Sequence, residues 1–127
     1  MHKQDLAIVK SLVTVAWADG RIASEENDVI EALLSAFDAT PAEVALVRDY
    51  AREPKALEDV PLTDLHADDR RILLQHAVLL TFIDGAQHEK EKALLLRLAA
   101  HLRIAEAERD QLLHAATERA KRLLGLL

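Results

Sequence analysis

The sequence predicts an all-α domain, and three observations support that prediction. Apolar residues recur every three to four positions through nearly the whole chain, which is the spacing of amphipathic helices. The 127 residues include only three Gly and three Pro, whereas Ala, Leu, Glu and Arg, all good helix formers, are common. No stretch of the sequence alternates strictly as a half-buried strand does. A chain of this length is expected to fold as a single domain over residues 1–127.

Three helices are expected in the first half of the chain. The first is predicted over about residues 5–18, with a buried side formed by Leu6, Val9, Leu12, Val13 and Trp17. Ser24 is expected to cap the second helix, whose acidic first turn suits the positive end of the helix dipole. A third helix is predicted to reach about Arg52, because Thr-Pro-Ala-Glu at 40–43 forms a capping box with Pro at the first helical position.

The second half is expected to form three more helices. Residues 54–66 contain two prolines and several charges, so they are predicted to be a joint with at most one short turn of helix. Beyond the joint, the apolar spacing predicts helices over about 68–82, 88–102 and 105–124.

The sequence also repeats itself at a spacing of 65 residues. Residues 17–37 (WADGRIASEENDVIEALLSAF) align without a gap with residues 82–102 (FIDGAQHEKEKALLLRLAAHL). Asp19 aligns with Asp84, and Glu26 aligns with Glu91. We therefore expect an internal duplication of a three-helix unit, with repeat 1 at about 5–53 and repeat 2 at about 67–124. Two unrelated amphipathic hairpins are the alternative.

Composition excludes several classes of function. The net charge of −6 disfavours binding to nucleic acid, which requires a basic surface. The absence of cysteine excludes disulfides, thiolate metal sites and cysteine nucleophiles. The densest apolar run, at 72–83, is too short for a membrane span of roughly twenty residues. No signal-peptide pattern opens the chain, so a cytoplasmic location is expected.

The two Asp-Gly dipeptides, at 19–20 and 84–85, are the candidate site. Glycine just after a helix is a common C-cap, so capping alone would explain Asp-Gly at the end of a helix. An Asp at a helix C-terminus, however, opposes the helix dipole. Capping of the helix C-termini also does not explain why Glu26 and Glu91 follow. The spacing of Asp, Gly and Glu matches the second half of an EF-hand loop. Apolar residues occupy the positions of the first ligands, so a conventional EF-hand is excluded.

Two such half-sites can form one site if the repeats pack about a pseudo-twofold axis. Asp19, Glu26, Asp84 and Glu91 would then converge, and four close carboxylates require either raised pKa values or a bound cation. Oxygen ligands favour calcium, magnesium or manganese, and His88 in the second loop would shift the preference toward zinc. The alternative is that these residues are solvated caps and acidic helix starts.

A helix ending in Ala-Asp-Gly, with an apolar residue two positions later and Glu seven after the Asp, resembles the tellurite-resistance TerB-like family. The similarity is strongest over 13–37 and recurs more weakly over 79–102, where Gln87 and Lys90 depart from the pattern. The resemblance implies an all-helical fold duplicated around two central helices. It also implies a divalent-metal site formed by Asp19, Glu26, Asp84 and Glu91. Its relatives include the N-terminal domain of a membrane-anchored DnaJ-like co-chaperone.

The resulting expectation is a non-catalytic module that holds a divalent cation and binds a protein partner in a stress or tellurite- and metal-resistance response. The partner is unidentified, and the family relative points to membrane-associated complexes; a homodimer is compatible with the sequence. The alternative is a metal-independent interaction domain whose acidic end docks a basic protein. A metal-dependent hydrolase is the third hypothesis.

Other polar residues are expected to have structural roles. His76, His101 and His114 are predicted to be hydrogen-bonded histidines at the edge of the core, and Glu31, Arg70 and Arg71 to lie on solvated helix faces.

Overall fold

The computed structural model describes residues 1–17, 20–83 and 87–126, and within these ranges it contains helices and no strands. The prediction of an all-α fold is therefore confirmed. Six α-helices are described: α1 (Lys3–Ala16), α2 (Ser24–Ala36), α3 (Pro41–Tyr50), α4 (Ala67–Thr81), α5 (Glu89–His101) and α6 (Glu106–Leu123). Between α3 and α4 lie two short 3₁₀ helices, η2 (Leu57–Asp59) and η3 (Leu62–Asp64).

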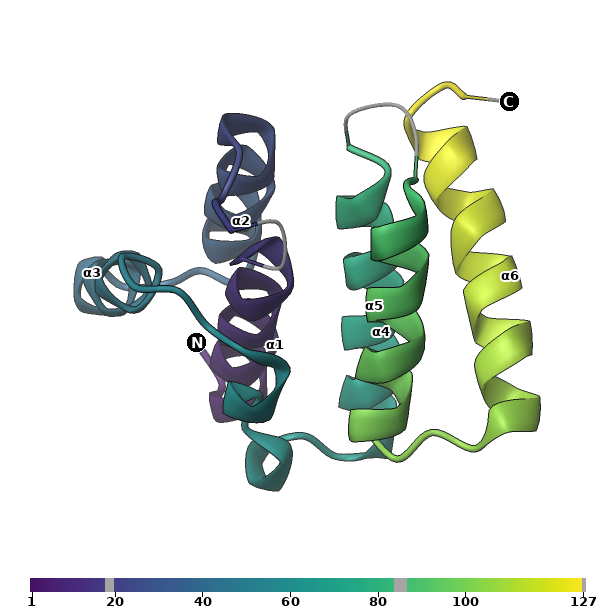
Figure 1. Ribbon diagram of the computed structural model, residues 1–127. Coiled ribbons are helices and arrows are strands. Elements are labelled where there is room, and N and C mark those ends of the chain that lie inside the picture. The colour runs from purple at the N-terminus through teal and green to yellow at the C-terminus, as the bar shows by residue number, and fades with distance from the viewer. Residues whose placement is uncertain (18–19, 84–86, 127) are drawn as a thin grey trace.

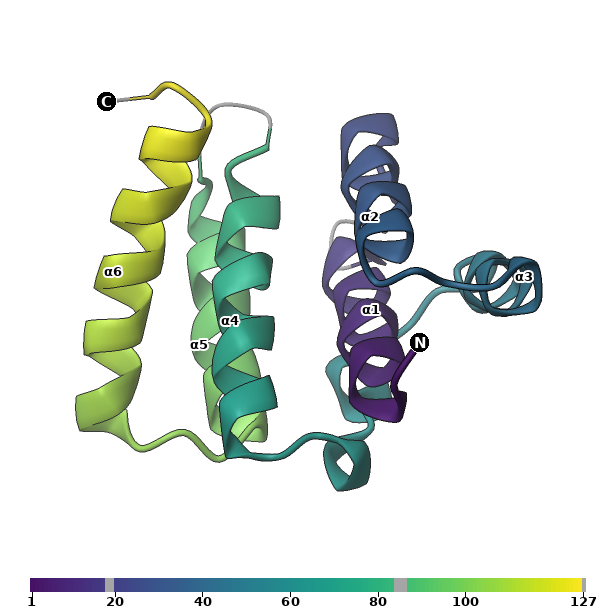
Figure 2. The same cartoon turned by 180° about the vertical axis from the view of Figure 1, so that it is seen from behind.

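The helices form two groups that meet along α1 and α4. Figures 1 and 2 show α1, α2 and α3 on one side of the molecule and α4, α5 and α6 on the other. α1 packs against α4, and α4 also contacts α5 and α6. In Figure 1, α1 and α4 both run upward, whereas α2 and α5 both begin at their upper ends and run downward.

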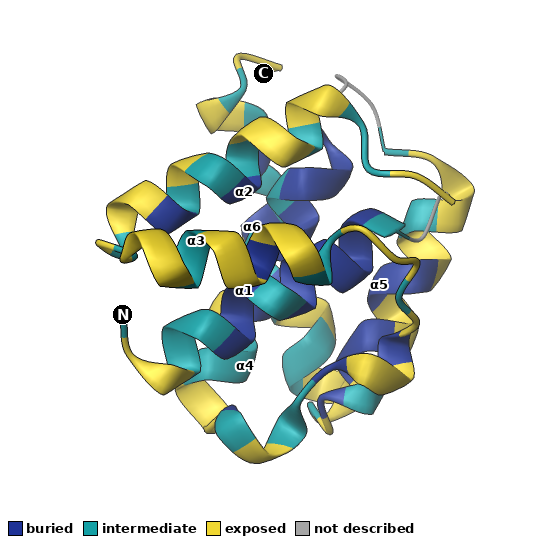
Figure 3. Ribbon diagram, turned by 90° about the vertical axis from the view of Figure 1, so that its left-hand side faces the viewer, coloured by how far each residue is buried: buried dark blue, intermediate teal, exposed yellow. Residues whose placement is uncertain are grey.

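The core lies mainly on α1 and α4. From Ala7 to Ala16, every residue of α1 except Lys10 is buried, as expected for a helix packed on most of its surface. α4 contributes a second buried stripe that includes Leu73, Leu74 and Val78. The outer helices contribute less: α3 has only Val47 buried, and Figure 3 shows most of its turns as exposed or intermediate.

Helix boundaries in the two halves recur at the predicted spacing. α2 and α5 begin at Ser24 and Glu89, 65 residues apart, and α3 and α6 begin at Pro41 and Glu106, again 65 apart. The residues that follow α2 and α5 also correspond. Asp38 and Arg103 both have positive φ, of 58° and 61°, and each is followed by an amide that donates to a carbonyl five residues earlier.

The third helix of each half departs from this correspondence. α3 has 10 residues and lies across the other helices, so that Figure 1 shows it end-on, whereas α6 has 18 residues and runs alongside α4. Trp17, at the end of α1, contacts α3 by donating from Nε1 to the carbonyl of Ala51 at 3.0 Å. The corresponding Phe82, at the end of α4, lies beneath Lys121 of α6, with Nζ 5.9 Å from the ring centroid.

Two local predictions are wrong in detail. Ser24 is the first residue of α2 rather than its N-cap, because Ala23 already has the extended backbone of an N-cap, with φ −68° and ψ 156°. The joint contains two short helical turns, η2 and η3, rather than one at most, and they bury Leu57 and the neighbouring Val60 and Leu65 against the core. No described helix is both long and apolar enough to cross a membrane.

Candidate functional site

The structure describes three of the five residues predicted to bind a metal. Glu26, His88 and Glu91 lie at the starts of α2 and α5. Asp19 and Asp84 lie outside the described residues. The convergence of all four carboxylates therefore stays a prediction.

Glu26 and Glu91 occupy the same position of their helices. Glu26 is the third residue of α2, and its Oε1 accepts a hydrogen bond from the backbone N–H of Ala23, 2.9 Å away. Glu91 is the third residue of α5, and its Oε1 accepts from the backbone N–H of His88, also at 2.9 Å. Each glutamate thus satisfies a backbone donor at the start of its own helix, as a capping-box glutamate does.

This geometry gives the two glutamates a structural reason to be present. In each case the N-cap side chain makes no hydrogen bond back to the helix, so the glutamate supplies only one half of a capping box. His88 is itself the N-cap of α5, and its side chain is exposed. Across 1–17, 20–83 and 87–126, no three His, Asp or Glu side chains gather as a metal site would require.

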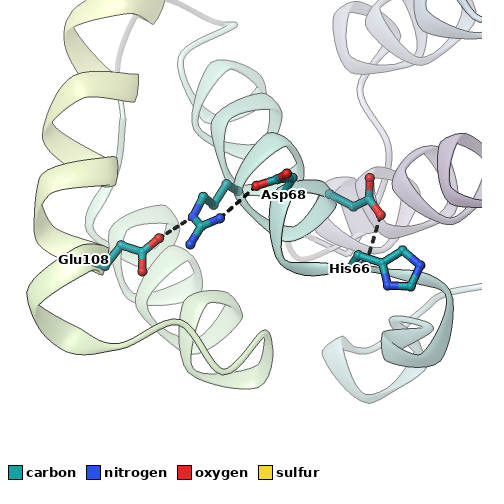
Figure 4. A network of polar contacts seen from close by, with 5 residues as sticks. His66, Asp68 and Glu108 are labelled. Atoms are coloured by element: carbon teal, nitrogen blue, oxygen red, sulfur yellow. Dashed lines mark hydrogen bonds and ion pairs between the residues drawn. The ribbon is translucent and has the colours of Figure 1, made fainter.

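A second polar cluster joins the starts of α4 and α6. Arg71 of α4 pairs through Nε with Glu108 of α6, and its Nη1 donates to Asp68 at 2.9 Å. Figure 4 shows Asp68 and Glu108 on opposite sides of this guanidinium. The hydrogen bond from Arg71 holds the pKa of Glu108 below its usual value, and the same contact raises the pKa of Arg71. His66, the N-cap of α4, donates from its backbone N–H to Asp69 at 2.9 Å.

Among the described residues, only backbone oxygen atoms accept hydrogen bonds from the guanidinium of Arg70. Its guanidinium donates to the carbonyls of Leu62, Leu65 and Leu102 at 3.2, 3.0 and 3.0 Å. These bonds tie the joint, the start of α4 and the end of α5 together. The expectation that Arg70 lies on a solvated face is wrong. Arg71 and Glu31 also form ion pairs, the latter with Arg48 at 2.9 Å.

Arg70 and Arg71 border an open cleft of about 460 Å³. Its walls come from the start of α4, the end of α5 and the start of α6, and its charged lining includes Arg70, Arg71, Arg103 and Glu108. One sequence signal could have indicated this cluster. Arg70 and Arg71 stand near the start of a helix, where positive charge opposes the helix dipole.

The three helical histidines have different environments. His76 is half-buried in a smaller cavity of about 140 Å³ between α4 and α6. Burial lowers its pKa, and the nearby charge of Arg119 lowers it further. His101 has a buried Nε2 without a hydrogen-bond partner among the described residues, whereas His114 is exposed. The prediction of a hydrogen-bonded histidine at the core edge is thus wrong for His101, and His114 is not a core-edge residue.

The chain matches no known family model, no curated protein and no solved structure.

Proposed function

We propose that this chain is a non-catalytic helical binding module that holds a divalent cation beside the starts of α2 and α5. The observation that carries the proposal is the correspondence between Glu26 and Glu91. Both are the third residue of helices that begin 65 residues apart, and both follow an Asp-Gly dipeptide at the same distance. Figure 1 places the starts of both helices toward the upper end of the molecule.

The proposed ligands are Asp19, Glu26, Asp84 and Glu91, with His88 as an additional donor. Carboxylate oxygens favour calcium, magnesium or manganese, and recruitment of the His88 imidazole would favour zinc. The capping hydrogen bonds are compatible with this role, because each carboxylate has two oxygen atoms and several lone pairs. In the structure, Oε1 of each glutamate is the capping atom.

We also infer that the chain is a duplicated, TerB-like domain, with repeat 1 at about 5–53 and repeat 2 at about 67–124. The equal spacing of helix starts and of the positive-φ residues supports the duplication. The resemblance of the Asp-Gly segments supports the family and, with it, a role in a stress or metal-resistance response. A protein partner, in a membrane-associated complex as for the co-chaperone relative, follows from the same resemblance.

The test separates ligation from capping. Glu26→Gln and Glu91→Gln keep an oxygen that can cap the helix but remove the charge that a cation needs. Glu43→Gln is the matched control, since Glu43 is the third residue of α3 and caps Thr40 in the same way, with 2.9 Å from its Oε1 to the amide. In calorimetric titrations with calcium, magnesium, manganese and zinc, we expect the first two variants to weaken binding at least about tenfold, the loss of one charge-assisted contact.

The control should bind as the parent does. A double variant, Asp19→Ala with Asp84→Ala, should abolish binding while leaving both capping glutamates in place. Parent-like affinity in the double variant, or an equal loss in Glu43→Gln, would contradict the metal site.

A metal-independent interaction module is the second candidate, and the capping bonds of Glu26 and Glu91 favour it because they explain these residues without an ion. A chelator distinguishes the two functions. If a cation stabilises the fold, removing it lowers the melting temperature, and restoring it in excess raises that temperature again. An unchanged melting temperature in both steps would favour the docking module.

A further inference from the structure

We propose that the cleft bordered by Arg70, Arg71 and Arg103 binds a phosphate group, either as the free ion or as part of a small phosphate ester. The cleft, of about 460 Å³, has the volume of a small-molecule site and lies at the starts of α4 and α6. This site involves none of the residues proposed to hold a divalent cation.

The charges around the cleft are opposite to those of the whole chain. The chain has a net charge of −6, yet the described lining contains three arginines and Glu108 as its one carboxylate. Asp68 and Asp69 lie nearby but do not line the cleft: the side chain of Asp68 is 93% exposed, and Asp69 accepts the backbone N–H of His66. A local basic cleft in an acidic molecule would concentrate an anion at this point.

The three guanidinium groups supply different parts of the site. Arg70 is a fixed positive charge, because three carbonyl oxygens hold its guanidinium in place. Arg71 uses Nε and Nη1 in ion pairs. Arg103 is exposed, and its guanidinium has no hydrogen-bond or ion-pair partner among the described residues, although its backbone N–H donates to Ala100. The planar, multidentate donors of arginine suit the oxygen atoms of phosphate.

The start of α6 borders the same cleft. Its N-cap is Ala105, which has no side-chain acceptor and lines the cleft. In the corresponding α3, Thr40 caps the helix, and Glu43 accepts the N-cap amide. Glu108, the residue equivalent to Glu43, pairs instead with Arg71. The first turn of α6 therefore lacks the side-chain caps that α3 has, and helix N-termini favour anions.

Glu108 occupies the position of a competing anion. In its ion pair with Arg71, the side chains of Arg71 and Glu108 are 40% and 39% exposed. Solvent therefore screens the pair, and displacing Glu108 from Arg71 costs little free energy. A phosphate dianion brings more charge to the same guanidinium than one carboxylate does. Once displaced, Glu108 could turn back and cap Ala105, in the way that Glu43 caps Thr40.

The experiment uses inorganic phosphate as the probe, followed by calorimetry and by backbone amide shifts in NMR spectra at constant ionic strength. We expect saturable shifts at Ala105, Glu106 and Arg103. Arg71→Gln and Arg103→Gly should each weaken binding about tenfold or more, because each removes a charge-assisted donor. Glu108→Gln should strengthen it, because the competing charge is gone.

Arg48→Gln is the matched control. Arg48 also forms an ion pair with a glutamate, Glu31, but on α2 and α3, away from the cleft. It should leave phosphate binding unchanged. The proposal is overturned if Arg48→Gln weakens binding as much as Arg103→Gly does, if Glu108→Gln fails to strengthen it, or if the shifts do not saturate.

A second titration, with phenyl phosphate, distinguishes the two sources of the group. Tighter binding than inorganic phosphate would identify a phosphate ester that also uses the apolar wall at Ile104, and weaker binding would identify the free ion. In either case, binding of the phosphate group depends on the same three arginines.

Discussion

At the scale of single residues, the two positions that most constrain the backbone are Asp38 and Arg103. Both follow a helix and have positive φ, of 58° and 61°, where glycine has no steric penalty and most other residues do. Aspartate tolerates this conformation better than arginine, because its short side chain can hydrogen-bond locally. Arg103 is therefore the more strained of the pair, and its side chain lines the arginine cleft.

Replacing either residue with glycine should stabilise the fold. We expect Arg103→Gly to raise the free energy of unfolding by about 1 kcal/mol and Asp38→Gly by less, because the left-handed region costs a non-glycine residue roughly that amount. Denaturant unfolding with a constant m value measures this. Arg103→Gly should thus increase stability while it weakens phosphate binding. If Arg103→Gly instead lowers both the free energy of unfolding and the affinity for phosphate, the guanidinium has a structural role.

At the scale of elements, helix position could be predicted from the sequence because its causes are local. Apolar spacing and the Thr-Pro-Ala-Glu box placed the start of α3 correctly, and every described α-helix boundary that can be compared lies within about two residues of its prediction, the usual uncertainty of helix ends. The N-cap of α2 was missed because Ser24 has a capping side chain and Ala23 does not. The decisive feature is Glu26, three residues after Ala23, whose carboxylate reaches its amide.

Long-range packing could not be predicted in the same way. α3 and α6 begin at equivalent places, yet one crosses the other helices and the other runs along α4. Arg70 likewise finds its three carbonyl partners on three separate segments. For the proposed cation site, the sequence predicted acidic ligands but not the capping bonds of Glu26 and Glu91. It missed the arginine cleft, which is assembled from the start of α4, the end of α5 and the start of α6.

One polar pair in the second half replaces an apolar pair in the first. The buried Thr81 accepts a hydrogen bond from Nε2 of Gln87 at 2.9 Å and donates to the carbonyl of Val78 at 2.6 Å. The residues 65 positions earlier, Ala16 and Ile22, are both apolar and contact the core. The polar side chain of Gln87 thus has a polar partner in Thr81, whereas the residues 65 positions earlier are both apolar.

This pairing predicts a non-additive effect on stability. Thr81→Ala and Gln87→Ile should each lower the free energy of unfolding by about 1 kcal/mol. The first removes the acceptor of Gln87 Nε2, and the second removes the donor to Thr81 Oγ1. The double variant should cost clearly less than the two together, since it restores the apolar pair of the first half. Thermal or denaturant unfolding of the four proteins gives the coupling energy. Ala16→Thr alone, with no Gln opposite, is the control and should destabilise; strict additivity of the two changes would exclude the pairing.

At the scale of the whole molecule, the two proposed sites lie at opposite ends of the second helical group. α5 begins where α4 ends, near the candidate cation site, whereas the arginine cleft lies at the start of α4, the end of α5 and the start of α6. The proposed cation ligands and the residues that line the arginine cleft are different sets of side chains. Such an arrangement lets a cation and an anion bind without competing for the same side chains.

The pH dependence of stability also belongs to the whole molecule, because three shifted groups act in the same direction. The pKa of His76 is lowered from 6.5 by burial, so the folded state favours the neutral imidazole. The unfolded chain then binds more protons just below pH 6.5, and stability falls as the pH decreases through this range. Glu43 and Glu108 have pKa values lowered from 4.5, so their contribution is present above that pH and is lost as the pH falls further.

We therefore expect the melting temperature to be nearly constant at neutral pH, to decline from about pH 6.5 downward, and to fall again below about pH 4.5. His76→Gln should remove the first decline and keep the second, whereas Glu108→Gln should reduce only the second. His114→Gln, which alters an exposed histidine of α6, is the control and should retain both. Because Arg119 contributes to the shift at His76, Arg119→Gln should make the first decline shallower without abolishing it, since burial is the larger cause. A decline that begins near pH 6.5 and survives in His76→Gln would assign the acid sensitivity to another group.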